Sequence, residues 1–224
     1  LHKTFYINQQ VTYGLLFKAA GEALRIAAAN PKYLGAETGA VAVLHTWGQT
    51  LMYHPHIHMI VPAGGLSEDG VEWVLSGKKF FLPVKVLSRL FRGILCRLLE
   101  QAAANVKIRL PDEVGVFDRL KQLIYAKPWV VYAKNPFAGP EHVIEYLGRY
   151  THRVAISNHR IISEKDGKVT FRYKDYRTGA LIRQMTLETT VFIRRFLQHV
   201  LPCGFYKIRY LGILAQCNAK TKLQ

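Results

Sequence analysis

Histidines and tyrosines form two short patterns that could act together on a phosphodiester bond. From His54 to His58, every second residue is a histidine. Farther along the chain, Tyr146 and Tyr150 stand four residues apart. Imidazoles bind divalent metal ions, and a phenol oxygen can act as a nucleophile. On a strongly basic chain, these residue types together predict metal-assisted cleavage and rejoining of a DNA strand.

The histidine run alternates with apolar residues, which is typical of a β-strand. Successive side chains of a strand point to opposite faces, so His56 and His58 share a face about 6–7 Å apart. A catalytic metal needs a third protein ligand, and the preceding segment offers His45 and Gln49. If the two segments pair antiparallel, we expect Gln49 near His56. His54 precedes a proline and is expected to mark the strand entrance.

Two alternatives to a metal site of this kind remain. The histidines could be ordinary surface or packing residues. Gly48, five residues and then His54-x-His56 also match the opening of the cupin metal motif. However, Ile60 and Val61 stand where that motif has a glutamate, and cupins are all-β proteins.

The tyrosine pair falls in a predicted helix that begins at Gly139-Pro140-Glu141. Residues four apart differ by about 40° around a helix, so Tyr146 and Tyr150 can face one site. A phenol has a pKa near about 10 and needs assistance to attack phosphorus. Ordinary packing also explains such a pair, because the chain has 12 tyrosines. Only the histidines give this pair a chemical role.

Composition favours a nucleic-acid partner. The 224 residues include 31 Lys and Arg against 15 Asp and Glu, a formal net charge of +16. Cys96, Cys203 and Cys217 form no CxxC pair, which argues against a disulfide framework or a zinc knuckle. No apolar run reaches the roughly 18 residues of a membrane span, and no signal peptide is evident. We therefore expect a cytoplasmic bacterial protein, associated with the nucleoid when acting, and no membrane partner.

Helical and strand patterns are mixed along the chain, which predicts the α+β class. Helices are expected over residues 11–29, 84–104, 111–125 and 189–201, as well as around the tyrosine pair. Strands are expected over 39–44, 56–61 and 129–132. Residues 154–162 and 169–173 flank a turn and predict a β-hairpin.

Two segments resemble the two-tyrosine HUH transposases of the insertion-sequence-91 type, including those of common-region elements. They are LHTWGQTLMYHPHIHMIVPAGGL (Leu44 to Leu66) and YLGRYTHRVAISNHRI (Tyr146 to Ile161). The resemblance covers nearly the whole chain. It implies one HUH catalytic domain over residues 1–224, with a central antiparallel sheet flanked by helices. It also implies rolling-circle-type transposition through a single-stranded DNA intermediate, with Mg²⁺ or Mn²⁺ as cofactor.

The resemblance assigns roles residue by residue. His56 and His58 would be metal ligands, and Tyr146 and Tyr150 the nucleophiles that form 5′-phosphotyrosine links. Related initiator proteins have a ligand seven residues before the first of these histidines, which is Gln49 here. Members usually begin with a Cys-rich zinc module and a first strand, and we expect this chain to lack both.

Basic residues interleaved with aromatic ones predict a DNA-contacting region over about residues 155–224. The residues expected to bind DNA are Arg149, His152, Arg153, Arg160, Lys174 and Arg177. The runner-up function is an inactive, truncated DNA-binding remnant of such a transposase. A metalloenzyme unrelated to DNA is a third alternative.

Overall fold

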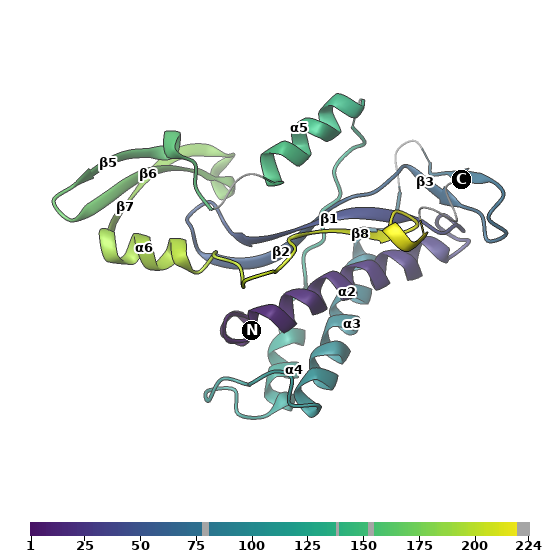
Figure 1. Cartoon of the computed structure of the whole chain (residues 1–224), viewed down its shortest axis with the longest axis horizontal. Helices are drawn as coiled ribbons and strands as arrows, with labels where there is room; N and C mark the ends of the chain where they lie inside the picture. The colour runs from purple at the N-terminus through teal and green to yellow at the C-terminus, as the bar shows by residue number, and fades with distance from the viewer. Residues whose placement is uncertain (78–80, 138, 152–154, 219–224) are drawn as a thin grey trace.

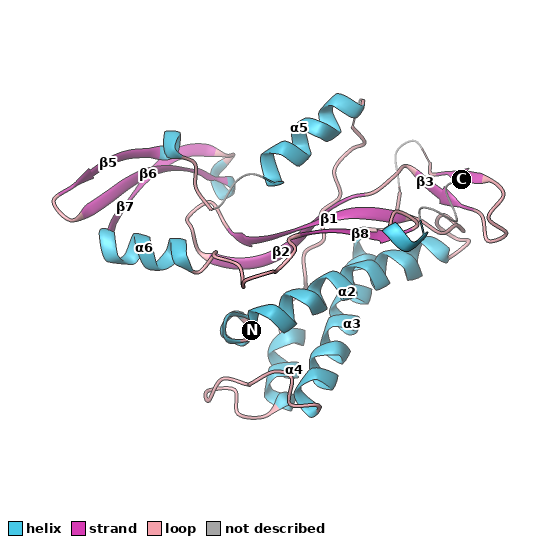
Figure 2. Cartoon of the chain, in the orientation of Figure 1, coloured by secondary structure: helices cyan, strands magenta, loops and turns pink. Residues whose placement is uncertain are grey.

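Helices and antiparallel sheets make up the fold, which confirms the α+β class (Figure 2). The computed structural model describes residues 1–77, 81–137, 139–151 and 155–218, and the side chains of residues 149–151 and 177 lie outside that description. In chain order the elements are α1 (His2–Ile7), α2 (Gln9–Ala29), β1 (Gly39–Trp47), β2 (Tyr53–Ile60), β3 (Gly64–Leu66), β4 (Trp73–Leu75), α3 (Val84–Ala104), α4 (Phe117–Tyr125), α5 (Pro140–Thr151), η1 (Asn158–Arg160), β5 (Ile161–Lys165), β6 (Lys168–Asp175), η2 (Tyr176–Thr178), β7 (Leu181–Glu188), α6 (Thr189–Leu197) and β8 (Ile208–Gly212).

The central sheet has the strand order β2-β1-β8, and both pairings are antiparallel. Helices α2 and α3 lie on one side of it and α5 lies on the other (Figure 1). Leu44 of β1 and Ile57 of β2 are directly paired and belong to the core that includes Leu16 and Leu99. Alternation therefore turns the neighbouring residues of both strands toward α5.

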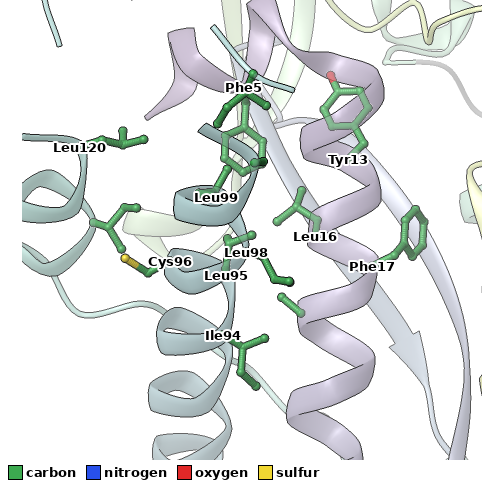
Figure 3. Close-up of a cluster of buried hydrophobic side chains, with 14 of the residues drawn as sticks. Phe5, Tyr13, Leu16, Phe17, Ile94, Leu95, Cys96, Leu98, Leu99 and Leu120 are labelled. Carbon is green, nitrogen blue, oxygen red and sulfur yellow. The ribbon is translucent and has the colours of Figure 1, made fainter. Parts of the chain in front are cut away.

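The main core fills the space between α2 and α3 (Figure 3). Leu16 extends from α2 toward Leu95 and Leu99 of α3, whereas Phe17 of α2 points away from α3 and lies 6.4 Å from Phe205 between ring centroids. All four side chains are buried, with Leu95 and Leu99 at 0% exposure. Apolar residues recur at helical spacing in both α2 and α3 and produce this contact. The resulting core supports one face of the central sheet.

A second sheet, in the order β5-β6-β7, is an antiparallel meander with α6 on one face. Phe171 of β6 is fully buried and lies 5.8 Å from Phe192 of α6 between ring centroids. Phe196 packs in the same cluster. Strands β3 and β4, which follow β2 in the chain, form a separate two-stranded hairpin.

Several predicted element boundaries are wrong. The helix expected from residue 111 begins only at Phe117, because a turn at Pro111 ends in Gly115 with φ +69°. The helix expected to reach residue 201 ends at Leu197. The first strand of the predicted hairpin begins at Ile161, after the η1 turn, and Val154 lies outside the described residues.

Residues 129–132 form no strand, although their sequence favours one. Trp129 packs on Phe91 at 5.5 Å, and its indole nitrogen donates to the carbonyl of Ile124. Val130 and Tyr132 are 90% and 79% exposed. The segment is therefore held on α3 and α4 through the Trp129 side chain and through the Trp129 carbonyl, which accepts from Ser88 of α3. Its backbone pairs with no strand among the described residues.

Within the described ranges, no helix combines the length and apolar character needed to cross a membrane.

Truncating the core at Leu99 should destabilise the fold. We expect Leu99→Ala to lower the free energy of unfolding by about 2–5 kcal/mol, because it removes apolar contacts and leaves a cavity. Urea denaturation measures the change. Leu123→Ala on α4 is the matched control, because Leu123 is 49% exposed, and it should cost well under half as much. Equal losses in the two variants would contradict this account of the core.

Candidate metal and nucleophile site

Strand pairing between β1 and β2 assembles a cluster of three histidines. His45 pairs directly with His56, and Val43 pairs with His58. These partners share the face opposite to the α2–α3 core, so the three imidazoles converge. The candidate ligand atoms of His45, His56 and His58 all lie within 4.8 Å of one another. Three neighbouring imidazoles could hold a divalent metal ion.

Hydrogen bonds indicate which imidazole nitrogens are available. His56 Nδ1 lies 2.7 Å from the carbonyl oxygen of His54, which can only accept, so Nδ1 carries the proton. In neutral His56 the lone pair is then on Nε2, which lies 3.0 Å from Nε2 of His58. A backbone carbonyl that fixes the tautomer in this way is typical of metal-binding histidines. His54 thus contributes its carbonyl oxygen to the site.

The protein environment keeps two of the imidazoles neutral. Burial lowers the pKa of His56, partly offset by its bond to the His54 carbonyl. Burial, together with His56 and the cation of Lys134, lowers the pKa of His58 to about 4. His45 is buried and stacks on Trp47 at 4.7 Å between ring centroids. A neutral imidazole has a lone pair that can bind a metal near pH 7, so the donor set fits a divalent metal.

Helix α5 brings Tyr146 to this cluster. The Tyr146 hydroxyl lies 2.9 Å from Nδ1 of His58, across 88 residues of sequence. Phe137 contacts the tyrosine ring edge-on at 5.3 Å, and the Lys134 ammonium lies 5.9 Å from the ring centroid. The aromatic contact fixes the ring, and the cation raises the positive potential around the hydroxyl. This arrangement joins a tyrosine oxygen to the candidate metal ligands.

Gln49 occupies a different place from the one expected. His45 lies opposite His56, and strand β1 ends at Trp47 before it reaches Gln49, so the expected Gln49–His56 pairing is wrong. The Gln49 side-chain oxygen instead accepts a hydrogen bond from the backbone of Lys174, at 3.3 Å. In this structure Gln49 faces the second sheet, and His45 completes the histidine cluster.

The turn between β1 and β2 is held by residues from the C-terminal part of the chain. Arg160 donates to the carbonyl of Gln49 at 2.6 Å, and Arg195 donates to the carbonyl of Thr50 at 3.1 Å. His199 Nε2 donates to the carbonyl of Leu51 at 3.1 Å, and Leu51 is fully buried with φ +60°. These contacts fix the strand ends that carry the imidazoles.

His199 also contacts β1 directly behind the histidine face. With its Nε2 proton donated to a carbonyl, its Nδ1 accepts from the hydroxyl of Thr46 at 3.2 Å. The ring is 2% exposed, and burial lowers its pKa. This histidine therefore has a positioning role, which sequence spacing could not reveal because it lies 153 residues from Thr46.

The remaining predicted site residues are only partly described. Tyr150 follows Tyr146 by one turn of α5. Arg160 binds backbone carbonyls of Gln49 and Arg172, and Lys174 is exposed on β6. The side chains of Arg149, Tyr150 and Arg177, and the whole of His152 and Arg153, lie outside the described residues.

Comparison with known proteins gives consistent names. Residues 39–222 match the family model Y2_Tnp, described as "Putative transposase". The chain is 52% identical to "Putative transposase y4qJ" of Sinorhizobium fredii, over 97% of this chain and 56% of that protein. It is 32% identical to "Transposase for insertion sequence element IS801" of Pseudomonas savastanoi pv. phaseolicola, over 89% of this chain and 48% of that protein.

The chain therefore spans about half the length of these curated relatives. No solved structure matches it. The family match covers residues 39–222, which include the segments that carry the histidine cluster and Tyr146.

Metal binding should depend on His45 more than on Gln49. We expect His45→Ala to weaken Mn²⁺ binding at least about tenfold, because it removes one of three imidazole donors. Isothermal titration calorimetry at constant pH measures this loss. Gln49→Ala should change the affinity less than threefold, because the three imidazole donors remain. His54→Ala is the matched control, because the carbonyl that accepts from His56 remains. A larger loss for Gln49→Ala than for His45→Ala would restore Gln49 as the third ligand.

Proposed function

This chain belongs to the Y2_Tnp family of transposases, and we propose that it cuts and rejoins single-stranded DNA by metal-dependent attack of a tyrosine. One observation carries the proposal: the Tyr146 hydroxyl lies 2.9 Å from an imidazole of the three-histidine cluster. This contact places a candidate nucleophile beside the groups that would hold a metal, which is the arrangement that phosphoryl transfer to a tyrosine requires.

In the proposed reaction the Tyr146 oxygen forms a bond to phosphorus, and the bond from phosphorus to the 3′ oxygen breaks. The products are a 5′-phosphotyrosine link and a free 3′-OH, with the phenol proton transferred overall to the departing oxygen. The link preserves the phosphodiester's energy, so a 3′-OH can attack it and reseal a strand without a nucleotide cofactor. Cleavage and joining are thus one reaction run in two directions.

His45, His56 and His58 would hold the metal, which is Mg²⁺ or Mn²⁺ in this proposal. When bound, a divalent ion neutralises charge on the scissile phosphate and orients its oxygens. If Nε2 of His58 held the metal, the proton of the neutral ring would be on Nδ1, and Nδ1 would donate to the Tyr146 oxygen. A hydrogen bond donated to a phenolate favours that charged form, so His58 would also help activate the nucleophile.

Tyr150 is the proposed second nucleophile. Its place one helical turn after Tyr146 would allow two linked strand transfers without release of a DNA end. Arg149, His152, Arg153, Lys174 and Arg177 are proposed to contact DNA, together with Lys134, which lies beside the Tyr146 ring. Arg160 would act differently, by fixing the β1–β2 turn through the Gln49 carbonyl.

Tyr146→Phe combined with Tyr150→Phe should abolish the covalent intermediate, because the double variant lacks both proposed nucleophiles. The protein is mixed with a single-stranded oligonucleotide bearing the ends of a mobile element of this family, in the presence of Mn²⁺. Denaturing gel electrophoresis then detects a protein–DNA adduct. The double variant keeps the residue-146 ring that packs on Phe137 but lacks both attacking oxygens, so we expect its adduct to fall at least about a thousandfold, as expected for loss of the nucleophiles.

Tyr132→Phe is the matched control, because Tyr132 is exposed in the segment before α5, and its adduct should remain unchanged. His56→Ala should remove the dependence on Mn²⁺. Salt-sensitive DNA binding with no adduct from the wild-type chain, or from a longer version of it, would overturn the proposal. That outcome would favour a non-catalytic DNA-binding remnant.

A further inference from the structure

We infer that the face of the β5-β6-β7 sheet turned away from α6 binds double-stranded DNA. The inference rests on the proposed function, because it gives that function a second DNA contact next to the cleavage site. The substrate class is different: the histidine cluster and Tyr146 would act on a single strand, whereas this face would hold the adjoining duplex.

The register of the sheet separates its two faces. Val169, Phe171, Met185 and Leu187 alternate onto the face that packs on α6. The residues between them fall on the opposite, open face: Lys168, Thr170, Arg172 and Lys174 from β6, Ile182, Gln184, Thr186 and Glu188 from β7, and Ser163 and Lys165 from β5. Ile182, Gln184 and Thr186 of this open face are exposed, while α6 packs on the other face.

Charge on the open face suits a phosphate backbone. Lys165, Arg172 and Lys174 are exposed, and no salt bridge engages them within the described residues. Lys168 and Glu188 lie 3.7 Å apart at one end and offset each other. A solvated sheet face usually mixes acids and bases to avoid edge pairing and association. An excess of unpaired cations on a flat surface instead favours a polyanion.

The centre of the face carries groups that can read base edges. Arg172 pairs directly with Gln184 across β6 and β7, and Thr170 and Thr186 are joined by a 2.9 Å hydrogen bond beside them. Arginine can bond guanine and glutamine can bond adenine in the major groove, which admits β-strands as well as helices. Stacking aromatics, which single-strand platforms need, are turned to the other face, as Phe171 is. These residue types favour duplex DNA.

The open face is positioned to continue the path of the DNA toward Tyr146. In Figure 1, α6 lies below β5-β6-β7 as α2 and α3 lie below the central sheet, while α5 lies above. The open face and the histidine face are therefore turned to the same side. The β1–β2 turn joins the two sheets through Arg160, Arg195 and His199.

Binding assays can separate this face from the catalytic site. Fluorescence anisotropy would compare a random-sequence duplex with one of its single strands, in EDTA so that no cleavage occurs. For the variant Arg172→Gln/Lys165→Gln, we expect duplex affinity to fall at least about tenfold and the salt slope to fall by about 2. Affinity for the single strand should fall less than threefold, because the open face offers it no stacking surface.

The control Lys85→Gln/Arg89→Gln makes the same charge change on exposed residues of α3, and should leave duplex affinity within about twofold because electrostatics beyond a Debye length are screened. Gln184→Glu tests the face from another strand and should weaken duplex binding as well. Equal losses for duplex and single strand, or no loss beyond the control, would overturn the inference. Binding measured in EDTA does not depend on cleavage. Failure of the adduct assay would therefore contradict the proposed chemistry but would leave the outcome of this binding assay unchanged.

Discussion

The pairing of β1 with β2 is the constraint on which the site depends. Its register sets His45 opposite His56 and turns both, with His58, away from the core. A slip of one residue would exchange the two faces, placing imidazoles against α2 and apolar side chains against α5. Burial of Leu44 and Ile57 opposes that slip. The apolar face thus stabilises the fold and at the same time selects the geometry of the histidine cluster.

The side chains that surround the histidine face come from segments distant in sequence. Helix α5 contributes Tyr146 from 88 residues beyond His58, and the preceding loop contributes Lys134 and Phe137. His199 supports the same strands from still farther along the chain. Tyr146 and His199 contact the sheet directly, whereas Lys134 and Phe137 contact the Tyr146 ring. The central sheet therefore acts as the rigid part, and later segments deliver reactive or positioning groups to it.

Sequence patterns predicted those features whose signal is local. The helices at residues 9–29 and 84–104 carry long apolar stripes, so their periodicity alone located them closely. The alternation from His56 to His58 likewise placed two imidazoles on one face. Strand β8 was missed because it is short and pairs with β1 across the chain, which no local pattern records. Strand β7 was missed because most of its residues are exposed.

The incorrect predictions near the site concern where strands end and which segments form strands. Gln49 was expected opposite His56, but His45 lies there and strand β1 ends at Trp47 before it reaches Gln49. The β-prone run at residues 129–132 has propensity but no partner strand, so Trp129 packing decides its course instead. In both cases a tertiary contact overrode a local preference. The ligand role of Gln49 and the roles of Tyr150 and the DNA-contacting cations stay predictions.

The way the β1–β2 turn is held has a consequence for sequence drift. Arg160, Arg195 and His199 all donate to main-chain oxygens, and every residue type has such an oxygen. These three hydrogen bonds therefore do not depend on the side chains of residues 49 and 50, although the Gln49 side chain makes its own contact with Lys174. The three donors differ in this respect, because each supplies its own side chain. In an alignment of relatives, we expect the turn beside the histidine cluster to diverge more than its distant supports.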